Sequence, residues 1–150
     1  MTQVLSPLAG HVIALEDVPD PVFADAMVGP GLAVDPLREP TDVVAPVCGK
    51  LVKLHPHAFV IVTDSGTGVL VHLGIDTVEL KGEGFTLRVE EGSTLTAGQT
   101  IVSWDPAEIE AGGRSPICPV VALEAKPEQL SDMAQPGVVQ AGSPLFTWSV

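Results

Sequence analysis

Residues 59–73 read FVIVTDSGTGVLVHL, and the fold of the chain depends on how this stretch is arranged. Two apolar segments, 59–63 and 69–73, each have the length of a short β-strand, and the residues DSGTG between them are typical of a turn. The stretch therefore predicts an antiparallel hairpin. His72 interrupts the second apolar segment, so the hairpin determines which residues lie beside this imidazole.

A second histidine, His57, comes just before the first of these strands. If His57 pairs with His72, 14 residues lie between them, which suits arms of about five paired residues and a short loop. Taken alone, a histidine on a strand is more often a hydrogen-bonded structural residue. Two adjacent imidazoles allow one ring to act as a nucleophile while the other donates a hydrogen bond. We therefore expect His72 to accept a phosphoryl group, with His57 and backbone N–H groups near glycines hydrogen-bonding its oxygens.

The composition indicates one mostly β domain that spans residues 1–150. The chain is 45% apolar, with 14 Pro, 15 Gly and no Tyr, and its apolar residues fall in short runs between turn residues. A net charge of −12 argues against nucleic acid as a partner, because affinity for nucleic acid depends on Lys and Arg. An acidic surface instead speeds encounters with a basic protein, or simply serves solubility.

The chain carries no sign of export or membrane insertion. Its first residues lack the pattern of a signal peptide, and no apolar run approaches the ~18 residues of a membrane-spanning helix. We therefore expect a cytoplasmic protein that does not itself span a membrane. Cys48 and Cys118 have neither the spacing of a metal site nor that of a redox motif, and we expect both to be buried free thiols.

Two echoes in the sequence indicate an internal duplication. Residues 6–13 (SPLAGHVI) match 45–52 (APVCGKLV), with a proline and a glycine both displaced by 39 positions. Residues 97–104 match 141–148 in an Ala-Gly pair and a final tryptophan, both displaced by 44 positions. We predict an all-β fold: an antiparallel β-sandwich or barrel-like structure with internal pseudo-symmetry, in which each half covers the hydrophobic face of the other.

Short helical turns are expected between the strands, one of them within residues 127–133. Residues 16–29 (EDVPDPVFADAMVG) contain two early prolines and then space their apolar residues as a helix does, so we expect one or two turns ending at the final glycine. In a generic protein Val22, Phe23 and Met27 of this segment would serve as core. A second helix is expected within residues 106–113, opened by a proline and closed by two glycines.

The residues around both histidines resemble one bacterial family closely. Residues 71–85 (VHLGIDTVELKGEGF), with 57–59 (HAF) and 64–66 (DSG), resemble the glucose-type IIA component of the bacterial phosphoenolpyruvate-dependent sugar phosphotransferase system (PTS). The resemblance begins near residue 6, includes EDVPD at 16–20 and continues to the C-terminus. It implies a single PTS EIIA type 1 domain, a β-sandwich with a duplicated hybrid motif, that acts as a phosphotransferase component and requires no metal or cofactor.

The resemblance also implies a role for each site residue. His72 would accept a phosphoryl group on Nε2 from the phosphocarrier protein HPr and pass it to a cysteine in the IIB domain of a sugar permease, while His57 stabilises that group. Neither the sugar nor the permease follows from the sequence. A partner-binding surface would combine carboxylates with apolar side chains: Asp20, Asp76 and Glu79, with Val22, Phe23, Met27, Val28, Leu70 and Val78.

One position departs from the family and leaves other functions open. Members commonly carry a threonine two residues before the assisting histidine, whereas this chain has His55, an auxiliary site residue if it replaces the hydroxyl. His55, His57 and His72 together would also suit zinc in a hydrolase-like domain, unless Pro56 twists the first two apart. A third alternative is a regulatory protein with this fold that binds other targets and transfers nothing. The intact pair of histidines argues against that alternative.

Overall fold

The structure is a computed structural model that describes residues 1–149. Most of its regular structure is β, as the sequence predicts. The strands are β1 (Thr2–Leu5), β2 (Gly10–Ala14), β3 (Gly31–Pro36), β4 (Thr41–Val44), β5 (Gly49–His55), β6 (Ala58–Val62), β7 (Gly68–His72), β8 (Phe85–Leu87), β9 (Thr94–Leu95), β10 (Thr100–Trp104), β11 (Cys118–Ala122), β12 (Leu130–Ser131), β13 (Gly137–Val139) and β14 (Pro144–Trp148). The helical elements are short: η1 (Leu15–Asp17), α1 (Pro21–Ala24), η2 (Thr77–Leu80), α2 (Pro106–Ala111) and η3 (Pro127–Gln129).

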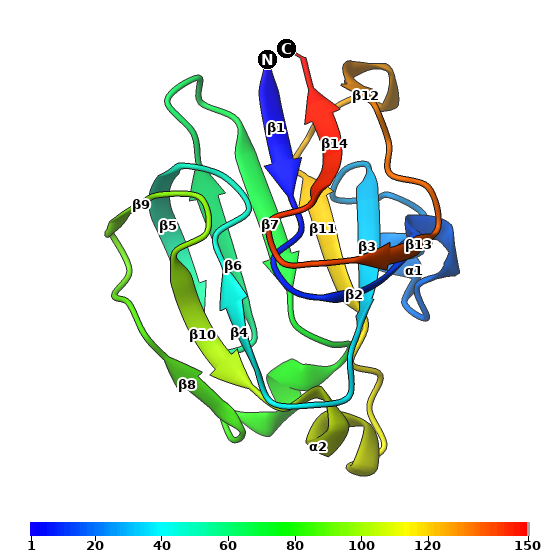
Figure 1. The fold of residues 1–150 in the computed structure, drawn as a ribbon, viewed down its shortest axis with the longest axis vertical. Coiled ribbons are helices and arrows are strands. Elements are labelled where there is room, and N and C mark those ends of the chain that lie inside the picture. Colours follow the sequence, from blue (N-terminus) through cyan, green and yellow to red (C-terminus); the bar gives the residue numbers. More distant parts are fainter. Residues whose placement is uncertain (150) are drawn as a thin grey trace.

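The strands form one large sheet and two small ones, and their pairings are antiparallel (Figure 1). The large sheet has eight strands in the order β13-β2-β3-β11-β7-β6-β5-β9. The small sheets have the orders β1-β14-β12 and β4-β10-β8. Both ends of the chain lie together at the top of Figure 1, because β1 pairs with β14 and places Thr2 opposite Trp148.

The duplication predicted from the two echoes is present in the strands. β4 begins and ends 39 residues after β1, and β10 begins and ends 44 residues before β14. The copies also hold each other reciprocally: the Leu5 N–H donates to the Pro46 carbonyl at 2.9 Å, and the Val44 N–H donates to the Pro7 carbonyl at 2.8 Å. This exchange is what a two-fold axis requires. The structure therefore confirms a pseudo-symmetric antiparallel β fold.

The main core combines equivalent residues of the two copies. Val4 and its counterpart Val43 are fully buried, and Trp104 and its counterpart Trp148 are each 4% exposed. Full burial of a valine side chain contributes about 1.5–3 kcal/mol to the free energy of unfolding, so equivalent positions in the two copies are expected to contribute similar amounts. A smaller core lies under α1 and consists of Leu15, Val18, Phe23, Ala33, Ile75 and Val121. This smaller core ties the α1 segment to the end of β7.

The central hairpin forms as predicted, but its register differs by one residue. His72 lies opposite Ala58 rather than His57, and the Leu73 N–H donates to the His57 carbonyl at 2.7 Å. The loop between β6 and β7 sets this register: Val62 pairs with Gly68, which leaves residues 63–67 as the loop and places Ala58 opposite His72. Pro56 and His57 lie in the two-residue turn that joins β5 to β6 and belong to neither strand.

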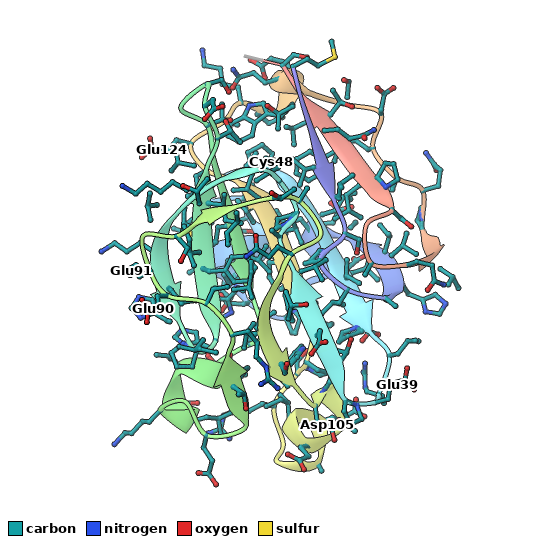
Figure 2. The ribbon with its side chains drawn as sticks, turned by 60° about the vertical axis from the view of Figure 1, so that its left-hand side comes forward. Glu39, Cys48, Glu90, Glu91, Asp105 and Glu124 are labelled. Atoms are coloured by element: carbon teal, nitrogen blue, oxygen red, sulfur yellow. The ribbon has the colours of Figure 1, made fainter. Side chains whose placement is uncertain are left out.

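The two cysteines are free thiols, but only one of them is buried. Burial raises the pKa of the Cys118 thiol to about 12, so this side chain stays protonated and unreactive. The expectation that Cys48 is also buried is wrong. It lies in the turn before β5 and is exposed, with the Ala97 N–H 3.3 Å from its sulfur atom (Figure 2).

The expected helical segments are present. The Asp20 carboxylate caps α1 by accepting a hydrogen bond from the Val22 N–H at 2.9 Å, and α1 ends earlier than predicted, at Ala24. The second helix, α2, begins at Pro106 and ends just before Gly112, as predicted. Within residues 1–149, none of the helices has the length and hydrophobicity that crossing a membrane requires.

The glycines Gly10 and Gly49 provide a test of the pseudo-symmetry. At each one a Cβ would overlap a carbonyl oxygen of the neighbouring strand, that of Asp35 or of Val62. We expect Gly10→Ala and Gly49→Ala each to lower the free energy of unfolding by about 2 kcal/mol or more, because backbone cannot yield as a side chain can. Urea unfolding followed by tryptophan fluorescence measures this. Gly112→Ala, whose Cβ would meet nothing closer than 3.5 Å, is the control. A large loss at only one of the paired glycines would contradict the symmetry.

Candidate functional site

His72 lies at the end of β7, where a backbone hydrogen bond holds its ring. Its Nδ1 atom is 2.6 Å from the carbonyl oxygen of Gly74. Because a carbonyl oxygen can only accept, Nδ1 of the neutral ring carries the proton, and the lone pair remains on Nε2. The site therefore offers one nucleophilic nitrogen, and its identity is set by the backbone.

The conformation of Gly74 is what places this carbonyl. Its φ angle is +80°, and a Cβ there would lie 2.7 Å from Cγ2 of Thr77 and 3.0 Å from the Ser115 carbonyl oxygen. The buried Thr77 hydroxyl also donates to the Leu73 carbonyl at 2.7 Å, which fixes the loop after β7 from beneath. Sequence reasoning considered glycine N–H groups here and missed both the carbonyl and Thr77. Two features of the sequence could have indicated these contacts: Gly74 comes two residues after His72, and Thr77 places a hydroxyl among apolar residues.

His57 places its ring against that of His72. The ring centroids are 5.1 Å apart and the planes are inclined at 70°, so the two rings meet edge to face. The backbone hydrogen bond from Leu73 to the His57 carbonyl ties the β5–β6 turn to the end of β7. The structure therefore brings together the two histidines that the sequence predicts as partners.

His55, the last residue of β5, joins the same group of rings. Its centroid lies 5.7 Å from that of His57 with the planes 25° apart, so Pro56 does not separate the two side chains. Nearly parallel rings direct their nitrogens along similar lines, whereas zinc requires ligands that converge. Over residues 1–149, no group of three His, Cys, Asp or Glu side chains could hold a metal ion. The zinc alternative therefore has no ligand set in the described part of the chain.

Burial keeps the two inner histidines neutral. The pKa of His57 is lowered to about 4, mainly by burial and further by repulsion from charge on His72 and His55. Burial also lowers the pKa of His72, against the opposing effects of its backbone hydrogen bond and of the Asp20 and Asp76 carboxylates. An unperturbed imidazole titrates near pH 6.5, so both rings are unprotonated at pH 7 and His72 can act as a nucleophile.

The apolar residues predicted to bind a partner differ in exposure. Val22, Met27 and Val78 are 43%, 71% and 59% exposed, which is unusual for large apolar side chains. Phe23 is only 7% exposed, because it belongs to the smaller core, and its ring centroid lies 5.2 Å from that of His72. Two further residues, Val28 and Leu70, are partly buried against the same core.

The three predicted carboxylates also have different surroundings. Asp20 caps α1, as described above, and Asp76 is exposed just before η2 with a φ angle of +60°. Glu79 forms an ion pair with Arg114 at 3.5 Å. Because Asp20 and Asp76 both oppose the lowering of the His72 pKa, these two carboxylates and the histidine share one surface.

A solved protein structure has the same fold as this chain. The glucose permease IIA from Mycoplasma capricolum aligns with 96% of this chain and 93% of its own, with a TM-score of 0.87 and 35% sequence identity. The family model of the phosphoenolpyruvate-dependent sugar phosphotransferase system, EIIA 1, matches residues 2–127. The chain belongs to this EIIA family of the sugar phosphotransferase system.

Curated relatives agree with this assignment. The PTS system glucose-specific EIIA component of Oceanobacillus iheyensis is 42% identical over 120 residues, which cover 79% of this chain and 72% of that protein. The PTS system N-acetylglucosamine-specific EIICBA component of Escherichia coli K12 is 42% identical over 151 residues, which cover 97% of this chain. The chain spans less than a quarter of the length of that EIICBA protein and of its Klebsiella pneumoniae counterpart.

Replacing Gly74 should disturb both stability and the protonation pattern of His72. We expect Gly74→Ala to cost about 2 kcal/mol or more of unfolding free energy, because it combines left-handed strain with a packing overlap. Gly66→Ala is a matched control, since its φ angle is +86° and a Cβ there meets nothing within 4 Å. Nitrogen NMR of the folded variants measures the tautomer. If Gly74→Ala keeps both the full free energy of unfolding and the Nδ1–H tautomer of His72, the prediction is wrong and the Gly74 backbone does not determine that tautomer.

The lowered pKa of His57 can be measured directly. NMR titration of the ring protons should show His57 changing charge near pH 4. In the unfolded chain the same ring titrates near pH 6.5, so the unfolded state takes up the proton first. His57 therefore supports stability fully above about pH 6.5, and this support is lost as the pH falls from there toward 4. The stability of His57→Gln should fall less steeply over that window. A midpoint for His57 near 6.5 would contradict the burial argument.

Proposed function

We propose that this chain accepts a phosphoryl group from phospho-HPr on Nε2 of His72 and passes it to a cysteine in the IIB domain of a sugar permease. The observation that carries the proposal is the hydrogen bond between Nδ1 of His72 and the Gly74 carbonyl, which leaves Nε2 as the free nucleophile. Residues 1–150 act in this cycle as one EIIA domain, in the cytoplasm.

The transfer balances without any added proton or metal. The P–N bond of the donor phosphohistidine breaks as the Nε2–P bond of His72 forms, and the donor nitrogen keeps the electron pair. The proton on Nδ1 stays in place, and the Gly74 carbonyl disperses the positive charge that develops on the ring. Onward transfer reverses this sequence: the cysteine thiolate attacks phosphorus and the neutral His72 ring leaves.

His57 has the protonation state that a phosphoryl-stabilising residue needs. Its ring is neutral at pH 7, so it retains one N–H to donate to a phosphoryl oxygen without adding a fixed positive charge. A neutral donor stabilises the phosphoryl group in transit yet does not hold it so strongly that release becomes slow. The edge-to-face contact with His72 keeps this donor within reach of Nε2.

The surface around the histidines suits a transient protein partner. In the proposed docking, exposed Val22, Met27 and Val78 supply apolar contact, and Asp20 and Asp76, whose charges act on the pKa of His72, supply negative charge. Together with a net charge of −12, these carboxylates favour encounter with a partner that presents arginine or lysine. A docked partner also excludes water from the reacting groups, which strengthens the electrostatic interactions.

A labelling experiment tests the acceptor. Incubation with phosphoenolpyruvate, enzyme I and HPr should give an acid-labile, base-stable phosphoprotein. His72→Gln should remove the label, because amide nitrogen is not a nucleophile, whereas His11→Gln, on the exposed side of β2, should label as the unaltered chain does. Label retained in the His72 variant would exclude this histidine as the acceptor.

A second variant separates acceptance from delivery. His57→Gln should still receive phosphate but lose at least tenfold in the rate of transfer to a IIB domain, about the contribution of a charge-assisted hydrogen bond. The measurement is sugar phosphorylation in the reconstituted system with the phosphorylated variant as donor. Unchanged sugar phosphorylation would show that His57 is not needed.

A further inference from the structure

His55 occupies an unusual place for a histidine. It ends β5 and lies opposite Ala58, with only Pro56 and His57 between them, so it forms one side of a tight turn. Its side chain is exposed, yet its ring stacks on that of His57 at 5.7 Å. The exposed ring of His55 adds little to the core, but it covers one face of the His57 ring and so restricts the rotation of that ring.

The three imidazoles form a row with a defined order. His55 stacks on one face of His57 with the planes 25° apart, and His57 meets His72 edge to face at 70°. The ring of His57 therefore contacts both His55 and His72, and its backbone carbonyl accepts a hydrogen bond from Leu73.

We propose that His55 is a positioning residue: its ring stacks on His57 and holds the His57 N–H toward the phosphoryl group carried by His72. This inference rests on the proposed function, since it concerns the geometry of the phosphorylated site. His55 itself touches neither Nε2 of His72 nor the phosphoryl group, and it acts through His57.

The physical basis is that the χ2 torsion angle of His57 can change at little cost in energy. The χ2 angle of histidine has a broad energy profile, so a half-exposed imidazole rotates easily unless a neighbour restricts it. His57 lies in a turn and is only partly buried, and stacking by His55 restricts its ring further. Pro56 fixes one backbone torsion between them, and Gly82 approaches closely enough that a Cβ would lie 3.3 Å from Cγ of Pro56. The turn that carries both rings is therefore held in place.

Electrostatics supply an independent readout of the same contact. Burial is the main cause of the lowered His57 pKa, and charge on His72 and then on His55 lowers it further. Glu91, labelled in Figure 2, accepts a hydrogen bond from the Leu54 N–H at 2.9 Å and so brings a carboxylate close to the end of β5. Asp20 and Asp76 act on the pKa of His72, Lys53 precedes His55 by two residues on β5, and Lys81 and Glu83 flank Gly82, which approaches Pro56.

Two substitutions distinguish the effect of stacking by the His55 ring from the effect of its charge. His55→Phe keeps a ring that can stack but carries no charge, whereas His55→Ala removes both. We expect both variants to accept phosphate from HPr normally. Delivery to a IIB domain should fall about fivefold in His55→Ala, the effect of one weakened hydrogen bond, and should stay near normal in His55→Phe. His11→Ala, also an exposed histidine on a strand, is the control for surface substitution.

The pKa of His57, measured by NMR titration, completes the test. It should rise slightly in His55→Phe, where only the charge is lost, and further in His55→Ala, where His57 also becomes more exposed. Equal delivery by His55→Ala and the unaltered chain would overturn the inference, as would a defect in His55→Phe as large as that in His55→Ala. If the unaltered chain takes up no phosphate at all, the proposed function fails instead, so the two failures are distinguishable.

Discussion

The hydrogen bond from Nδ1 of His72 to the Gly74 carbonyl is the interaction on which the site depends. It selects one tautomer and so decides which nitrogen can react. The bond exists because Gly74 takes a φ angle of +80°, which turns its carbonyl back toward the end of β7. The buried hydroxyl of Thr77 and a backbone hydrogen bond from Ile75 to the Ser115 carbonyl at 2.8 Å hold that loop in place. The tautomer of a side chain is thus controlled by the packing of the loop beneath it.

The scaffold is symmetric, whereas the site is not. At the centre of the large sheet β7 pairs with β11, with Leu70 opposite Val121, so the two copies meet there. The connection between β2 and β3 is longer than the two-residue turn between β5 and β6, and it contains α1. One copy therefore supplies the histidines, and the other supplies the segment that packs Phe23 against His72.

Two opposing effects set the charge of the site. The carboxylates of Asp20 and Asp76 favour a protonated His72, but burial disfavours it and is the larger effect, so the ring stays neutral at pH 7. For His57 burial and the neighbouring imidazoles act in the same direction, which brings its pKa to about 4. The site thus keeps two neutral imidazole rings on a strongly acidic chain. In the proposed cycle, the arriving phosphoryl group is then the main change of charge at this surface.

The amino-acid sequence by itself determined the fold class, the duplication and the pairing of His57 with His72. These follow from local patterns: apolar segments separated by turn residues, displaced copies of one motif, and a hairpin that forces its two arms together. Tertiary structure alone decided the details that depend on backbone torsions and burial. The loop between Val62 and Gly68 shifted the register by one residue, and Phe23 became core because α1 folds onto Ile75. Cys48 stayed exposed, and the Gly74 carbonyl chose the reactive nitrogen of His72, because only assembled elements define which surfaces meet and which hydrogen bonds can form.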